Sequence, residues 1–266
     1  MRNARWILLA FLVAGCMSHK EIEDRKVLQA GYGALGQADY DTALAASDQF
    51  LHDNPNGGPG TPEALYLQGR VYEHNASTAD AAGRLPEARA DLQTARQTYE
   101  HALTLSPAPK VAALIHAGVA NVAYFQEDYF TAMREWSAAY TDLTQPDAKA
   151  WVLYRLGLCQ QRLGRFEDAD LNFTDVRREY PGTEPAQRAA VRQGARAFYV
   201  AIGSYTDSKS ADPVLAALRG NGFTAMTMMT PNGREAIRVG PAYNYDQAKA
   251  LRTRLMGAYP QAVIEP

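Results

Sequence analysis

Residues 151–181 read WVLYRLGLCQQRLGRFEDADLNFTDVRREYP, and most of the fold follows from this segment. Two apolar-periodic stretches flank a short turn: Gly157 lies in the first, Phe166 at the turn, and Ala169 in the second, which ends before Pro181. Small residues let two helix backbones approach closely, and proline stops the second helix. The segment therefore predicts a pair of antiparallel helices.

Three upstream segments carry the same pattern of a small residue, a turn residue, an alanine, often an aromatic, and a proline. Its members are Gly31, Tyr40, Ala43, Ser47 and Pro55; Gly69, Leu92, Ala95, Tyr99 and Pro107; and Ala120, Tyr129, Ala132 and Trp136, with Pro146 displaced. Leu92 lies 23 positions after Gly69, whereas Phe166 lies nine positions after Gly157. The second copy thus carries a 14-residue insertion, around 74–84, whose role the pattern leaves open.

This pattern resembles the tetratricopeptide repeat, and the resemblance covers residues 24–196. It implies an all-α helical solenoid whose concave groove binds extended peptides or partner helices, so we expect an unidentified protein partner there. A helix over 184–197 is predicted to cap the last apolar face, because solenoid ends must be covered. The alternative is that the solenoid only spaces the N-terminus from the C-terminal domain.

After residue 197 the apolar periodicity changes from helical to alternating. The predicted order is a strand over 198–202, a helix over 212–218, strands over 223–229 and 235–239, a helix over 245–256 and a strand over 262–264. This βαββαβ order predicts a four-stranded antiparallel sheet with two helices on one face. The expected fold class is an all-α solenoid followed by a ferredoxin-like α/β sandwich over 197–266.

Three segments of this second domain resemble the SPOR domain family. YVAIGSY at 199–205 resembles its opening strand, IRVGP at 237–241 its third strand and the following turn, and DQAKA at 246–250 the start of its second helix. The resemblance implies binding to septal peptidoglycan, with a preference for glycan strands stripped of their stem peptides, and no chemistry on them.

The resemblance places the glycan-binding surface on the open face of the sheet. Strand alternation puts Tyr199, Ala201, Ala236 and Arg238 there, with Ser204 and Tyr205 beside it at the exit of the first strand. A tyrosine ring can stack on a sugar, a serine can hydrogen-bond, and an arginine can bind a lactyl carboxylate through two donors.

Two of these residues also have simpler interpretations, and the sequence departs from the family pattern at three positions. Arg238 can instead be a solvated charge, and Ser204 can simply cap the turn. The family's glutamine is Ala201, the aromatic residue at the start of the third strand is Glu235, and the phenylalanine after Gly-Pro is Ala242, although Tyr243 can replace that phenylalanine from one residue along. These changes are expected to lower affinity for glycan. They favour the alternative function, a repeat scaffold for envelope assembly whose C-terminal domain no longer binds glycan.

The N-terminus has the features of an export signal. Basic residues precede an apolar run over 6–13, which is too short to span a bilayer and is typical of a secretory signal peptide. VAGC at 13–16 resembles the lipobox of bacterial lipoproteins, although an ordinary signal with an incidental cysteine remains an alternative. The resemblance implies a signal peptide over 1–15, a lipid on Cys16 that anchors the chain in a membrane, and a tether over 16–23. By analogy with enteric bacteria, the lack of aspartate after the cysteine favours the outer membrane, facing the periplasm.

Composition and motif spacing exclude several other classes of protein. The 266-residue chain is 47% apolar and 21% charged with a net charge of −2, which excludes a mainly disordered chain and argues against nucleic-acid binding. Two cysteines are too few for a disulfide scaffold or a four-cysteine zinc site, and Cys159 is expected to be buried and unreactive. GYGALG at 31–36 follows a charged helical stretch rather than a strand, so it does not indicate a nucleotide site. We expect no metal, no cofactor and no catalytic activity.

Overall fold

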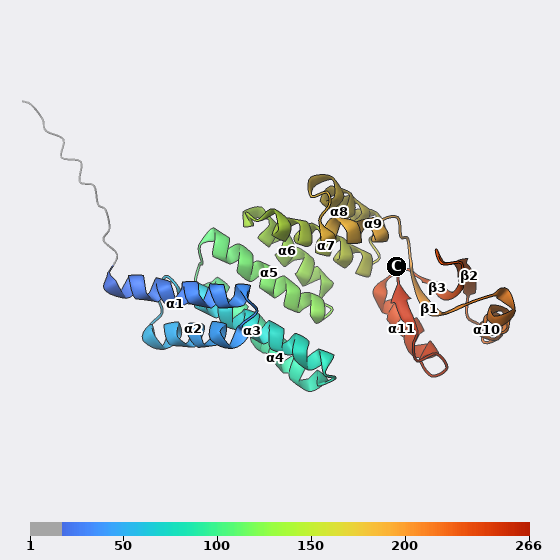
Figure 1. The fold of residues 1–266 in the computed structure, drawn as a ribbon, viewed down its shortest axis with the longest axis horizontal. Helices are drawn as coiled ribbons and strands as arrows, with labels where there is room; N and C mark the ends of the chain where they lie inside the picture. The colour runs from blue at the N-terminus through green and yellow to red at the C-terminus, as the bar shows by residue number, and fades with distance from the viewer. Residues whose placement is uncertain (1–17) are drawn as a thin grey trace, which may run out of the picture.

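The computed structural model describes residues 18–266, so the predicted signal peptide and Cys16 lie outside the described residues. Helices occupy the first two thirds of this part (Figure 1). They are α1 (His19–Gly36), α2 (Tyr40–Asp53), α3 (Thr61–Ala81), α4 (Leu85–Thr104), α5 (Pro109–Phe125), α6 (Tyr129–Asp142), α7 (Pro146–Arg162), α8 (Phe166–Glu179) and α9 (Glu184–Arg192). None of these helices, nor those that follow, combines the length and apolar character needed to cross a bilayer.

Successive helices pair as α1/α2, α3/α4, α5/α6 and α7/α8, and local sequence signals define their ends. Asp39 precedes α2 and Asp128 precedes α6, and each carboxylate accepts a hydrogen bond from a backbone N–H of the first turn at 3.1 Å. Such N-caps satisfy amides that have no partner inside the helix. Prolines at the first turns of α3, α4, α5 and α7 have no N–H that would need one.

Aromatic rings fill notches at glycines between the helices. The ring of Tyr99 lies against Gly69 and Gly118, and the ring of Phe173 lies against Gly157. A methyl group on any of these glycines would overlap the ring, and both rings are fully buried. The pairing of small and aromatic residues predicted from the sequence is therefore the packing element of the solenoid.

The 14-residue insertion of the second repeat is helical. The helices of that repeat, α3 and α4, have 21 and 20 residues, whereas α5 and α6 of the third repeat have 17 and 14. The additional turns form an arm, residues 74–92, along the lower edge of the repeats in Figure 1. The insertion therefore lengthens the helical pair instead of forming a flexible loop.

The C-terminal domain has the predicted βαββαβ order. Its elements are β1 (Phe198–Tyr205), α10 (Ser208–Gly220), β2 (Ala225–Met229), β3 (Glu235–Ala242), α11 (Tyr245–Leu255) and β4 (Val263–Glu265). The antiparallel sheet has the order β2-β3-β1-β4. Leu218 of α10 and Leu255 of α11 join one core with Val200, Ile202 and Val239, so both helices cover the same face. The predicted fold class is confirmed.

Four predicted boundaries were wrong by three or more residues. α10 begins at Ser208 rather than 212, because the Asp207 carboxylate caps its first turn and accepts a hydrogen bond from the Ser210 amide at 2.8 Å. β1 does not break at Gly203, because a bulge places Ile202 and Gly203 opposite Ile237 and the strand continues to Tyr205. β3 likewise continues past 239 to Ala242. The capping helix ends at Arg192 rather than 197, because Gly194 has a left-handed backbone (φ 86°) and the amide of Gln161 donates to the Arg192 carbonyl at 2.9 Å.

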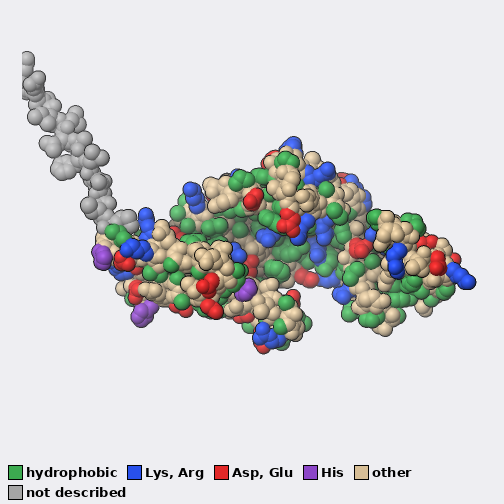
Figure 2. Space-filling view, in the orientation of Figure 1, with side chains coloured by type: hydrophobic (Ala, Val, Ile, Leu, Met, Phe, Trp, Pro, Cys, Tyr) green, Lys and Arg blue, Asp and Glu red, His purple; other side chains and the backbone are tan. Residues whose placement is uncertain are grey.

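The two domains meet at a compact junction. The guanidinium of Arg162 lies 3.3 Å from the ring centroid of Tyr245, and Phe198 contacts both Tyr245 and Phe166 with centroid distances of 5.7 and 5.5 Å. Gly164 (φ 80°) lies against the carbonyl of Tyr243, where any side chain would clash. Figure 2 shows the resulting narrow neck, with a hollow below it.

Two sequence motifs take no part in a site. The glycines of GYGALG lie within α1, where Gly31 packs against Leu67 and Ala46. Cys159 is fully buried in α7, and this burial raises the pKa of its thiol to about 12. Because the thiolate is the reactive form, the thiol is inert near neutral pH, as predicted.

Candidate functional site

The face of the sheet opposite α10 and α11 has no helix of residues 18–266 packed on it. Residues directly opposite each other in antiparallel strands lie on the same face, so strand pairing defines its surface. Three rows cross the sheet: Met228–Ala236–Ser204, Met226–Arg238–Ala201–Val263 and Gly240–Tyr199–Glu265. We call this surface the open face.

Tyr199 lies at the end of the open face nearest to the first residues of β1. Its ring lies over Gly240 of β3, and a Cβ atom at residue 240 would lie 2.9 Å from the ring. The glycine therefore sets the height and tilt of the ring above the sheet. Tyr199 is half-buried, so part of its side chain is accessible to a ligand.

Arg238 does not stand free on the open face. Its Nη2 donates to Oε2 of Glu265 at 2.6 Å, and its Nη1 lies 3.5 Å from the sulfur of Met228. Because Ala201 lies between β3 and β4 in this row, its small side chain leaves room for the arginine to reach across β1. The family has a glutamine at the position of Ala201. Its replacement by alanine therefore leaves space for the ion pair between Arg238 and Glu265, which crosses β1.

Ser204 lies on the open face opposite Ala236 and is held by Arg234 from the turn before β3. The Nε of Arg234 donates to the Ser204 hydroxyl at 3.2 Å, and its Nη2 donates to the Ser204 carbonyl at 2.7 Å. One lone pair of the hydroxyl is therefore engaged, while its proton remains available to a ligand. The serine has a turn-stabilising contact as well as an exposed hydroxyl.

Tyr205 and Glu235 lie on the other face. The bulge at Ile202–Gly203 shifts the alternation, so Tyr205 packs against the core beneath the helices, and burial followed by the nearby Tyr259 raises its pKa. Glu235 pairs with Tyr205 across the strands and accepts a hydrogen bond from the Ser208 hydroxyl at the start of α10. The expectation that Tyr205 lies beside the open face is corrected, and the carboxylate of Glu235 does not approach this face.

Four residues of the open face were missed in the sequence analysis. Met226, Met228 and Val263 are 37%, 42% and 52% exposed, and Glu265 is the partner of Arg238. The alternation within 225–229 and 263–265 was the available signal, but the strand order was needed to place these residues beside Tyr199.

The composition of the open face suits ligand binding. Apart from the pair of Arg238 and Glu265, the strand residues that form it are uncharged and largely apolar. It can therefore stack on flat apolar faces and hydrogen-bond at its edges. Within residues 18–266, the strands present no general acid, base or nucleophile in a catalytic arrangement on this surface.

A polar network links the first helices of three successive repeats, α3, α5 and α7. Glu73 of α3 accepts hydrogen bonds from Asn121 of α5 at 2.9 Å and from the Tyr99 hydroxyl at 3.0 Å. Arg155 of α7 donates to Asn121 at 2.7 Å and lies over the rings of Trp136 and Trp151. The network therefore ties successive repeats together.

Comparison with known protein families gives one match in each of the two domains. A SPOR domain family model matches residues 194–264, and a Tetratricopeptide repeat model matches residues 151–183. Among solved structures, a thermophilic TPR protein of Thermus thermophilus is similar, with 18% identity, a TM-score of 0.36, and coverage of 64% of this chain and 98% of that chain. No curated protein matches the sequence. The chain therefore contains a SPOR domain, of the peptidoglycan-binding kind, and a tetratricopeptide repeat, and both are kinds of domain that typically bind rather than catalyse.

Proposed function

We propose that this protein is a non-catalytic component of the bacterial cell envelope that binds peptide-stripped glycan strands of peptidoglycan through the open face and recruits a protein partner through its repeats. The observation that carries the proposal is the half-buried Tyr199, whose ring lies over Gly240 beside a largely apolar sheet surface on a SPOR domain. A glycan strand without stem peptides presents sugar faces and N-acetyl methyl groups that fit such a surface.

The glycan-binding set in this proposal is Tyr199, Ala201, Ser204, Ala236 and Arg238, to which we add Met226, Met228 and Val263 for contact area. Because Tyr199 is the only aromatic side chain on the open face among residues 18–266, its truncation should remove the largest single contribution. Ala201 and Ala236 matter by their small size, since they leave the surface flat.

The decisive experiment is co-sedimentation of the full chain with purified sacculi, comparing amidase-stripped with untreated material. Pelleting should be strong with stripped sacculi, weak with untreated sacculi, and lost in Tyr199→Ala. Tyr243→Ala is the matched control, because Tyr243 is an exposed tyrosine of the same domain outside the strand pairs of the open face. A folded wild-type protein that stays in the supernatant with both preparations would refute glycan binding.

That negative result would favour the second candidate, an envelope scaffold that works only through its repeats. The observation in its favour is the ion pair between Arg238 and Glu265, which already neutralises the cation that the third strand brings to the open face. The two candidates are separated by the same pelleting assay, since the scaffold predicts no difference between stripped and untreated sacculi.

The proposed anchor is a diacylglycerol thioether on Cys16 that holds the protein in the outer membrane, facing the periplasm. Metabolic labelling with a tagged fatty acid should mark the wild-type protein and not Cys16→Ala. Fractionation of labelled cells tests the choice of membrane, and localisation of a fluorescent fusion tests whether the protein gathers at the division septum.

A further inference from the structure

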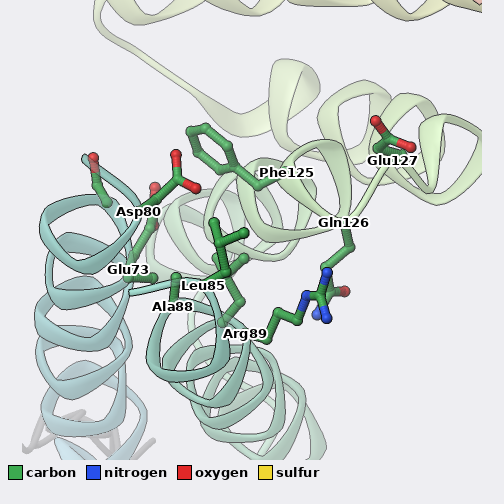
Figure 3. Close-up of a pocket in the computed structure, with 11 residues that line it drawn as sticks. Glu73, Asp80, Leu85, Ala88, Arg89, Phe125, Gln126 and Glu127 are labelled. Atoms are coloured by element: carbon green, nitrogen blue, oxygen red, sulfur yellow. The ribbon is translucent and has the colours of Figure 1, made fainter. Parts of the chain in front are cut away.

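The arm, residues 74–92, forms one wall of a pocket. The pocket has a volume of about 580 Å³ and lies between the arm and the α5–α6 turn (Figure 3). Its lining includes Asp80, Leu85 and Arg89 of the arm and, from neighbouring segments, Glu73, Phe125 and Glu127. This volume is within the range of protein sites that bury a ligand or an anchoring side chain.

Two large apolar side chains remain exposed at this pocket. Phe125 at the end of α5 is 61% exposed, and Leu85 at the start of α4 is 49% exposed. Both contribute to the lining, so the pocket offers apolar contact inside and at its mouth. In the third and fourth helical pairs the turn aromatics Tyr129 and Phe166, which like Leu85 begin a second helix, are buried at 8% and 6% exposure. The apolar surface at this pocket is therefore a local feature of the repeat that carries the arm.

The charges of the lining are mostly negative. Glu73, Asp80 and Glu127 share the lining with one cation, Arg89. Glu73 is held by Tyr99 and Asn121 and pairs with Arg70 at 3.6 Å. Glu127 is paired with Lys249 of α11, so Asp80 is the lining carboxylate that has no ion-pair partner within residues 18–266. This carboxylate of Asp80 beside an apolar mouth favours a ligand that carries a positive charge close to a bulky apolar group.

We propose that this pocket docks a segment of a protein partner in which a bulky apolar side chain lies beside a lysine or arginine. The apolar side chain contacts Phe125 and Leu85, and the cation lies near Asp80. The proposal rests on the proposed recruiting function of the repeats and gives it a location beside the arm, next to Glu73 of the first-helix network. The helical arm supplies one wall, which assigns a function to the insertion.

The pocket lies next to an ion pair between the two domains. Glu127 lines the pocket and also pairs with Lys249 of the C-terminal domain. A cationic segment bound in the pocket lies next to this interdomain ion pair and competes with Lys249 for the carboxylate. Partner binding at the arm therefore acts on the junction, while the open face of the sheet is not part of the pocket.

The test begins with selection from a phage-displayed library of random dodecapeptides on the purified full chain, followed by fluorescence anisotropy with the enriched peptides. The enriched sequences should share a bulky apolar residue within two positions of a lysine or arginine. Asp80→Lys and Phe125→Ala should each weaken binding of the enriched peptide by about tenfold. Circular dichroism of each variant checks that the helices remain folded.

The matched controls are Asp142→Lys and Phe130→Ala, which change an exposed aspartate and a 59% exposed phenylalanine outside the pocket lining. Both should bind the peptide as the wild type does, and so should Tyr199→Ala, which separates this result from glycan binding. Enrichment of no such motif, or equal binding by wild type, Asp80→Lys and Phe125→Ala, would overturn the proposal. An equal loss in Phe130→Ala and Phe125→Ala would also overturn it, because the contact would then lie outside the pocket.

Discussion

The two faces of the C-terminal sheet are built from the same strands but have opposite characters. The helix-covered face holds Val200, Ile202, Ile237 and Val239 at no more than 1% exposure, whereas Met228 and Val263 of the open face are 42% and 52% exposed. The strands alternate between these faces residue by residue. Stability should therefore depend on one set of positions and ligand binding on the neighbouring set, which substitutions can separate.

Ile237→Ala should have the largest effect and act on stability alone. Ile237 is fully buried beneath the helices, so truncation should lower the free energy of unfolding of the sheet domain by roughly 2–5 kcal/mol. The tryptophans Trp136 and Trp151 lie in the solenoid, so hydrogen exchange of the β1 and β3 amides is the suitable measurement. A loss well below this range would contradict the assignment of Ile237 to the core.

Gly240→Ala should affect both faces at once. The new methyl group would meet the Tyr199 ring at 2.9 Å and the Phe198 carbonyl at 3.1 Å, in a backbone conformation that favours glycine. We expect a loss of about 1–3 kcal/mol in stability from this strain, together with loss of pelleting with stripped sacculi. Gly257→Ala, at a glycine with no atom near its Cβ position, is the control that should change neither quantity.

Tyr199→Ala should separate binding from folding. The ring lies above the sheet rather than in the core, so stability should change by no more than about 1 kcal/mol. Affinity for stripped glycan should fall by about tenfold, as expected when an aromatic side chain that stacks on the ligand is removed. Thermal melting and quantitative pelleting on the same preparation measure both. A large drop in melting temperature would place Tyr199 among the structural residues.

Glu265→Gln should have the smallest effect on stability, and it should change glycan binding at the open face. The substitution removes the charge partner of Arg238, a pair that is partly exposed and should contribute less than about 1 kcal/mol to stability. The freed guanidinium should raise pelleting with stripped glycan by about twofold at low salt, and added salt should abolish the gain. Arg238→Gln in the same background should return pelleting to the wild-type level. An unchanged salt dependence would show that Arg238 does not contact the glycan.

Local sequence patterns predicted the elements of this sheet better than their exact ends. Alternation correctly separated Val200 and Ile202 from Tyr199 and Ala201, because pleated backbone places every second side chain on one face. It failed at Tyr205, since a bulge adds one residue to a strand without a clear sequence signal. Arg238 and Glu265 are neighbours only through strand order, which no local pattern contains.

The solenoid shows the same limit on a larger scale. The spacing between Gly69 and Leu92 revealed an insertion and its length, but only the structure shows that these residues continue two helices. The pocket beside the arm involves Phe125 from the following repeat, so it depends on how successive pairs stack. Repeat motifs describe the packing inside each pair and are less informative about surfaces between pairs.

The junction at Arg162, Tyr245, Phe166 and Phe198 also has a mechanical consequence. α1 and the sheet lie at opposite ends of the molecule, so a pull between them loads the helix stack and the junction in series (Figure 1). Each repeat shares long helical interfaces with its neighbour, whereas the junction is held by an aromatic cluster and the ion pair between Glu127 and Lys249. We expect the junction to yield first under tension, which would lengthen the molecule while both domains stay folded.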